Sequence, residues 1–153
     1  MKKRLLPLLF AFAAFSLQAQ TAWKESLNTL PVFDAKYYSA KYADVSSSNA
    51  AESWQKDGLI KGRVGSAVFD PVYYLQQNPD VIKKINGPTD YVGAALHWLE
   101  YGIQEGRPSH PEFNIKYYVK NNQDLYQAYG VDFRKLIEHY LTEGRAAGRK
   151  ATP

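Results

Sequence analysis

Tyrosine pairs, aspartates and arginines recur at fixed distances along this 153-residue chain. The tyrosine pairs are Tyr37 and Tyr38, Tyr73 and Tyr74, and Tyr117 and Tyr118; the aspartates are Asp44, Asp80 and Asp124; the arginines are Arg63, Arg107 and Arg149. An acid and an arginine at matching positions favour a structural pair, because the planar guanidinium suits carboxylates and loop carbonyls. The alternative is a row of acidic sites for a cation or a sugar.

The second tyrosine of each pair is the candidate ligand contact. Phe69 and Tyr73 are four residues apart and would share one helical face. We therefore expect the first tyrosines to join the other recurring aromatic residues in a buried seam between repeats. Those aromatic residues are Phe33, Phe69, Phe113, Trp54, Trp98 and Tyr140. The second tyrosines, Tyr38, Tyr74 and Tyr118, would point about 100° away from the first. Their hydroxyls would either bond a partly buried partner or line an outer groove as ligand contacts.

The histidines predict no metal centre. His97 and His139 share one repeat position, where the first copy has Ser53, and His110 lies in a "PSHPE" loop. Zinc requires three or four ligands at close spacing, and neither H-x-x-x-H nor H-E-x-x-H occurs. There is also no nucleophile elbow or phosphate-binding loop. We therefore predict no metal, no cofactor and no catalytic residues.

A small hydrolase, or a regulator of an envelope enzyme, is the alternative. Its acid and base would come from Asp80, Asp124, Glu105 and His97, which occupy repeat positions. Active sites are rarely replicated three times, so one cleft residue out of pattern with a shifted pKa would distinguish this class. Glu100 and Glu138 are residues of that kind. A purely structural scaffold that self-associates is a third alternative.

Two sequence blocks, each present three times, must position these side chains. The first block is "FDAKYYSAKYADV" (33–45), "FDPVYYLQQNPDV" (69–81) and "FNIKYYVKNNQDL" (113–125). The second is "SWQKDGLIKGR" (53–63), "HWLEYGIQEGR" (97–107) and "HYLTEGRAAGR" (139–149). Only the segment between the blocks varies in length, which is typical of repeat proteins whose insertions fall on loops. The repeats cover about 33–66, 69–110 and 113–149 within one domain, 33–153, and the first repeat is shortened.

Capping residues predict the helices of one repeat. Asp70 before Pro71 is typical of a helix start, and that helix should run to about Gln77. A second short helix is expected from Pro79 to Ile85. After a cap at Thr89 or Asp90, a longer amphipathic helix should run from Tyr91 to Tyr101 and end at Gly102. No long segment alternates with period two, so we predict an all-α fold of three stacked repeats, each with two short helices and a longer one.

The first 19 residues are typical of a bacterial secretory signal peptide. "MKKRLLPLLFAFAAFSLQAQ" has a basic start, an apolar run and a small residue, Ala19, placed for cleavage. The apolar run is shorter than the roughly 20 residues that span a bilayer, so no stable membrane anchor is expected after cleavage. Residues 20–32 would be a lead segment. Removing Lys2, Lys3 and Arg4 reduces the formal charge from +4 to about +1, which disfavours nucleic acid as a partner.

The repeat resembles a tandem motif of the form "FDPxYYLxxNPDV…HWLxxGxxEGR", found in exported bacterial proteins and in some polysaccharide-associated or glycosyltransferase-containing chains. The second copy matches it throughout, at Phe69 to Pro71, Tyr73, Tyr74, Asn78 to Asp80, Trp98, Gly102 and Glu105 to Arg107. In the other copies Ala35 and Ile115 replace the proline, and Lys61 and Ala147 replace the glutamate. The resemblance implies an accessory or interaction module outside the cytoplasm, and it carries no catalytic residues.

The function expected from these observations is binding. The signal ends near residue 19 and the last repeat arginine is Arg149, so we expect the repeats themselves to carry the function. Helical repeats commonly offer a groove to a partner. The 12 tyrosines and 3 tryptophans could stack on sugar rings or peptides. We therefore predict an exported, periplasmic or secreted, non-catalytic module that binds a glycan or a protein of the cell envelope or extracellular space.

Overall fold

The computed structural model describes residues 25–153, and this part of the chain is helical. Within it no residue belongs to a strand, and the only bridge of β type joins His110 to Phe113. The predicted all-α class is confirmed. The predicted signal peptide and residues 20–24 of the lead segment lie outside the described residues. None of the helices between residues 25 and 153 is both long enough and apolar enough to cross a membrane.

The helices follow the three sequence repeats, called here the first, second and third units. The first helices of the units are α2 (Ala35–Lys41), α4 (Pro71–Gln77) and α8 (Ile115–Asn121). Middle helices occur in the second and third units, as α5 (Pro79–Ile82) and α9 (Gln123–Tyr129). The last helices are α3 (Ala50–Ser53), α6 (Tyr91–His97) and α10 (Phe133–His139), each continued by a π-helical turn. These turns are η1 (Trp54–Gly58), η2 (Trp98–Gly102) and η3 (Tyr140–Gly144).

Side-chain caps start the helices where the sequence predicts them. Asp70 Oδ1 accepts hydrogen bonds from the backbone N–H groups of Val72, at 2.9 Å, and Tyr73, at 3.0 Å. Asp34 and Asn114 cap the matching helices. Of the two caps considered for α6, Asp90 is the one used, since its Oδ1 accepts from the N–H of Gly93 at 2.8 Å. Each bond satisfies a backbone donor that the first turn leaves without a partner.

Two predicted helix ends are wrong. The middle helix of the second unit ends at Ile82 rather than at Ile85. The long helix does not stop at Gly102, because it continues through η2 and α7 (Ile103–Glu105). Gly106 ends it with φ of 60°, the left-handed conformation that glycine adopts most readily. Gly102 instead serves a packing role inside the π-helical turn.

The assignment of the tyrosine pairs is also wrong, because the buried member is the second. Tyr38, Tyr74 and Tyr118 have no exposed surface. Their partners Tyr37, Tyr73 and Tyr117 are only half-buried. Phe69 precedes the cap Asp70 and is therefore not on the helix, so helical four-residue spacing does not apply to it. It packs instead on Tyr74, the fourth helical residue, with ring centroids 5.6 Å apart, as in a hydrophobic staple.

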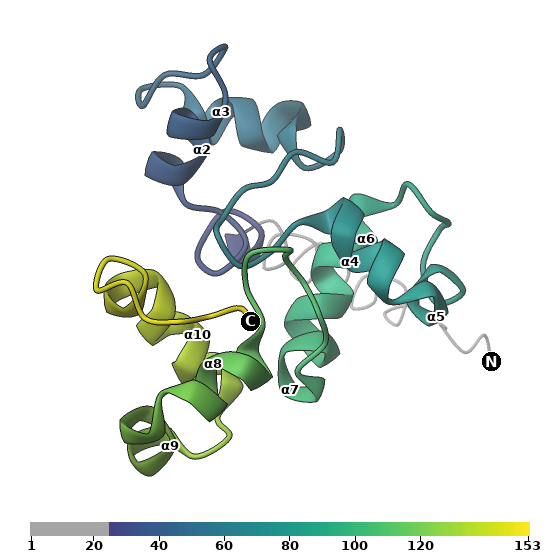
Figure 1. The fold of residues 1–153 in the computed structure, drawn as a ribbon. Helices are drawn as coiled ribbons and strands as arrows, with labels where there is room; N and C mark the ends of the chain where they lie inside the picture. The colour runs from purple at the N-terminus through teal and green to yellow at the C-terminus, as the bar shows by residue number, and fades with distance from the viewer. Residues whose placement is uncertain (1–24) are drawn as a thin grey trace, which may run out of the picture.

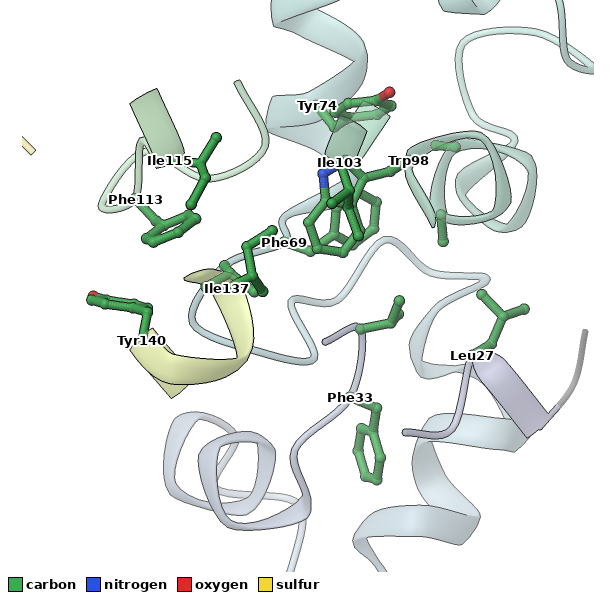
Figure 2. Close-up of a cluster of buried hydrophobic side chains, with 14 of the residues drawn as sticks. Leu27, Phe33, Phe69, Tyr74, Trp98, Ile103, Phe113, Ile115, Ile137 and Tyr140 are labelled. Atoms are coloured by element: carbon green, nitrogen blue, oxygen red, sulfur yellow. The ribbon is translucent and has the colours of Figure 1, made fainter. Parts of the chain in front are cut away.

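The phenylalanine of each unit also stacks on the aromatic residue that begins the π-helical turn. Phe69 lies 4.5 Å from Trp98 between ring centroids, with planes 19° apart. The matching distances are 5.3 Å for Phe33 and Trp54 and 4.6 Å for Phe113 and Tyr140. These six aromatic residues are buried, as predicted. Figure 2 shows that side chains from all three units meet in one cluster.

Each unit closes on itself through one backbone hydrogen bond. The N–H of the capping residue donates to a carbonyl two residues after the repeat arginine. The three pairs are Asp34 to Gly65 at 2.9 Å, Asp70 to Ser109 at 2.8 Å and Asn114 to Ala151 at 2.8 Å. The three predicted units lie around a common centre (Figure 1), and Arg145 of the third unit contacts Tyr37 of the first.

Candidate functional site

The recurring aspartates and arginines form one ion pair in each unit. Arg63 Nη2 lies 2.7 Å from Asp44 Oδ2, Arg107 Nη1 lies 2.8 Å from Asp80 Oδ1, and Arg149 Nη2 lies 2.7 Å from Asp124 Oδ2. The hydrogen bond from Arg107 lowers the pKa of Asp80 to about 2. The arginines likewise lower the pKa values of Asp44 and Asp124. More than half of each aspartate side chain is exposed, so the pairs contribute only modestly to stability.

An asparagine that the sequence reasoning overlooked completes this arrangement. Asn78 Nδ2 donates to the carbonyl oxygens of Tyr74, at 2.8 Å, and Pro108, at 3.0 Å, while Arg107 Nη1 lies 3.4 Å from its Oδ1. Asn122 makes the same bonds in the third unit. The sequence does mark this residue, because an asparagine precedes the repeat aspartate by two positions in both "QNPD" and "NNQD". The arginine therefore ties the end of its own unit to the first helix.

In the second and third units, the buried tyrosine bonds the recurring histidine. The hydroxyl of Tyr74 lies 2.9 Å from Nδ1 of His97, and the hydroxyl of Tyr118 lies 2.9 Å from Nδ1 of His139. In the first unit Ser53 replaces the histidine, and the hydroxyl of Tyr38 accepts from Arg63 at 3.3 Å. The proposed ligand role of Tyr38, Tyr74 and Tyr118 is therefore wrong for this conformation, because these rings are enclosed.

The glycine at the end of each π-helical turn makes room for that tyrosine. A Cβ atom added at Gly102 would lie 2.5 Å from the hydroxyl oxygen of Tyr74. The same approach occurs at Gly58 with Tyr38 and at Gly144 with Tyr118. Burial raises the pKa of Tyr118 to about 12 and raises that of Tyr74 as well, so both hydroxyls remain protonated. Gly102 is thus required by packing rather than by chemistry.

His97 presents its other ring nitrogen to a surface hollow. The side chain is 8% exposed, and burial lowers its pKa, so the imidazole is neutral near pH 7. Within residues 25–153, Nε2 has no hydrogen-bond partner and is not an enclosed atom. Because His97 lines the hollow, Nε2 is open to what occupies it.

This cavity, which we call the unit-2 hollow, has a volume of about 510 Å³. Its lining residues come from the segment that follows α5, from the cap and body of α6, from η2 and from the end of α7. They are Lys84, Ile85, Asn86, Asp90, Gly93, Leu96, His97, Glu100, Tyr101 and Glu105. Tyr101 is 49% exposed, and its ring centroid lies 5.4 Å from that of His97. The adjacent Glu100 raises the pKa of the Tyr101 hydroxyl.

Most charges of the unit-2 hollow already have partners. Glu105 is paired with Arg107, Lys84 Nζ lies 3.6 Å from Asp80, and Asp90 caps α6. Glu100 has no cationic partner among residues 25–153. An exposed ring, one imidazole edge and one carboxylate without a cationic partner therefore lie in the same hollow.

Three of the four acid and base candidates of the enzyme alternative are held by the repeat arginines, whereas the fourth, His97, lines the unit-2 hollow. Asp80 and Glu105 both bond Arg107, and Asp124 bonds Arg149. Arg107 also lowers the pKa of Glu105, which favours the ionised form over a proton donor. Glu100 and Glu138 line different hollows. No group of three or more histidine, aspartate or glutamate side chains in residues 25–153 is arranged to hold a metal ion.

The unit-2 hollow could be anticipated only in part from sequence. The recurrence of His97 and His139 identified one lining residue, whereas Tyr101 and Glu100 follow no repeat pattern and their exposure depends on the fold.

Comparison of the chain with models of protein families, with curated proteins and with solved structures finds no match.

Proposed function

We propose that the mature chain is an exported, non-catalytic module that binds a glycan or protein partner of the cell envelope or extracellular space, and that the unit-2 hollow is its ligand site. The observation that carries this proposal is the position of exposed Tyr101 beside His97 and beside Glu100, which has no cationic partner among residues 25–153. The second tyrosine of each pair is buried and the recurring Asp and Arg residues are ion-paired within their units, so these repeat positions are not free to contact a ligand.

The chemistry of the hollow favours a sugar. A tyrosine ring offers an apolar face to the C–H face of a pyranose, and its hydroxyl remains wet. The imidazole edge and the carboxylate of Glu100 can bond sugar hydroxyls, the carboxylate by charge-assisted hydrogen bonds. A concave surface with a few convergent polar groups is typical of ligand sites. The hollow also borders η2, and π-helical turns are frequent at functional sites.

Export is supported by the sequence. The basic and apolar start with Ala19 is typical of a secretory signal, and the repeat resembles a motif of exported and polysaccharide-associated proteins. The low charge of the mature chain, about +1, agrees with a partner other than nucleic acid.

The test is retention of purified mature protein on insoluble glycans. Peptidoglycan sacculi and a panel of surface polysaccharides would be incubated with wild type, with Tyr101→Ala and with Tyr126→Ala. Tyr126 is the matched control because it is 51% exposed and lies outside the hollow. We expect retention of wild type and Tyr126→Ala, and loss with Tyr101→Ala. Capture of a protein partner without glycan retention would overturn the glycan assignment, and unchanged retention of Tyr101→Ala would overturn the site.

A further inference from the structure

The third unit carries a hollow at the place that corresponds to the unit-2 hollow. This unit-3 hollow has a volume of about 320 Å³ and is lined by Tyr129, Lys135, Glu138, His139, Thr142 and Glu143. Five of these six residues occupy repeat positions that also line the unit-2 hollow, counted from His97 and His139. In both hollows the histidine Nδ1 is held 2.9 Å from a buried tyrosine hydroxyl. Each hollow is therefore lined by a histidine held in the same way, although Nε2 of His139 lies 3.8 Å from Glu143 whereas Nε2 of His97 has no carboxylate partner among residues 25–153.

Each hollow also has an exposed tyrosine, although the two come from different elements. The position of Tyr101 is taken in the third unit by Glu143. The ring there is Tyr129, the last residue of α9, with its centroid 6.2 Å from that of His139. Tyr129 occupies the repeat position of Ile85, which lines the unit-2 hollow. The third unit therefore supplies a ring from the repeat position of Ile85 rather than from that of Tyr101, so both hollows have an aromatic side chain beside the histidine.

The charges of the two hollows agree as well. Lys84 and Lys135 are each paired with a nearby aspartate, at 3.6 Å to Asp80 and 3.5 Å to Asp132. Glu138 has no cationic partner among residues 25–153, as Glu100 has none in the other hollow. An excess of carboxylates disfavours an anionic ligand, because like charges repel within a shared site.

The first unit has no counterpart. Ser53 stands where the other units have histidine, and the hydroxyl of Tyr38 is engaged by Arg63 instead. The first unit also lacks a middle helix that could supply a ring, since no helix lies between α2 and α3.

We propose that the unit-3 hollow is a second ligand site of the same class, so that one chain holds a neutral or amino-bearing polysaccharide at two points. This proposal rests on the glycan-binding function proposed above. Two weak sites on one molecule bind a polymer more tightly than either site alone, by about 100-fold or more when both can engage together. A short oligosaccharide that reaches only one site gains nothing from the second.

The test compares a polymer with its own short fragment. Galactomannan, cellulose ether, glycol chitosan and, as the anionic control, alginate would be included in native gels, and the tetrasaccharide of the best polymer would be titrated by NMR. We expect separate shifts of the His97 and His139 ring signals with the tetrasaccharide. Tyr101→Ala and Tyr129→Ala should each remove one set of shifts and reduce polymer affinity about 100-fold or more. The double variant should lose both.

The control for Tyr129→Ala is Tyr126→Ala on the same helix, which should bind as wild type does. Circular dichroism of each variant establishes that the fold is retained. If only the His97 signals respond, and Tyr129→Ala binds polymer as Tyr126→Ala does, the second site is disproved while the proposed function stands. Preferential binding of alginate would overturn the ligand class. If wild type binds none of the glycans, both proposals fall together.

Discussion

The guanidinium group of Arg145 lies over the ring of Tyr37, 5.3 Å from its centroid, and so joins the third unit to the first. Arg145 occupies the repeat position of Leu59 and Ile103, both of which are buried apolar residues. Ile103 begins α7, which packs against α10 of the next unit. At the same position the third unit has an arginine, which contacts the first unit instead, and the three units lie around a common centre (Figure 1).

A double-mutant cycle on Arg145 and Tyr37 should show energetic coupling. Because the contact is a partly exposed cation–π pair, we expect a coupling free energy of about 0.5–1 kcal/mol in urea unfolding of Arg145→Ala, Tyr37→Ala and the double variant. Tyr73 occupies the same repeat position in the second unit, and the guanidinium of Arg145 lies over Tyr37 and not over Tyr73, so the cycle of Arg145→Ala with Tyr73→Ala is the control. Equal coupling in both cycles would contradict the contact between the first and third units.

Within a tyrosine pair, the second member should contribute far more to stability. Tyr74 is fully buried against Phe69, whereas Tyr73 is half-buried. We expect Tyr74→Ala to lower the free energy of unfolding by about 3–5 kcal/mol, as large-to-small changes in a core do, and Tyr73→Ala by about 1 kcal/mol. Thermal and urea unfolding of the two variants would show the difference. Similar losses would refute the staple arrangement of Phe69 and Tyr74.

Gly102→Ala should be destabilising because of the tyrosine hydroxyl and not because of backbone conformation. The residue has helical φ of −61°, but an added Cβ would lie 2.5 Å from the buried oxygen of Tyr74. We expect a loss of about 1–3 kcal/mol in the free energy of unfolding, the usual cost of overpacking. Removing the oxygen in Tyr74→Phe should reduce the cost of Gly102→Ala measured in that background.

The control for that prediction is Gly148→Ala. Gly148 has φ of 66° and nothing within 4 Å of an added Cβ, so only the backbone cost of about 1–2 kcal/mol applies. This cost should be the same with Tyr74 or Phe at residue 74. If Gly102→Ala also lowers the free energy of unfolding by the same amount with Tyr or Phe at residue 74, the contact with the Tyr74 hydroxyl is not the reason that glycine is required.

Local sequence rules predicted where the helices begin more accurately than they predicted how the side chains pack. Asp70 and Pro71 fix the start of α4 because capping depends on neighbouring residues alone. The same rule, applied one residue earlier, would have identified Phe69 as the staple residue and Tyr74 as its buried partner. The role of Gly102 depends instead on a tertiary contact, since a Cβ atom there would collide with the hydroxyl of Tyr74 from another helix. The hollows depend on which rings and carboxylates the assembled units leave exposed, and no local pattern encodes that.

Acid should lower the free energy of unfolding over a pH range that is set by the buried histidine His110. His110 is 5% exposed, and its Nδ1 accepts a hydrogen bond from the N–H of Glu112 at 3.0 Å, which requires the neutral imidazole. Burial lowers the pKa of His110 against the opposing effect of Asp70 and Glu112, while Lys41 and Arg145 lower it further. The unfolded chain, with an ordinary pKa of about 6.5, therefore binds the proton more readily. The contribution of His110 to the free energy of unfolding should be complete above about pH 6.5 and fall as pH decreases through the lowered pKa of the folded state.

Urea unfolding between pH 7.5 and 4.5 should show this loss. The free energy of unfolding should depend less steeply on pH in His110→Asn, whose side-chain oxygen can still accept from the N–H of Glu112. An NMR titration that places the pKa of His110 above 6.5 would reverse the sign and reject the prediction.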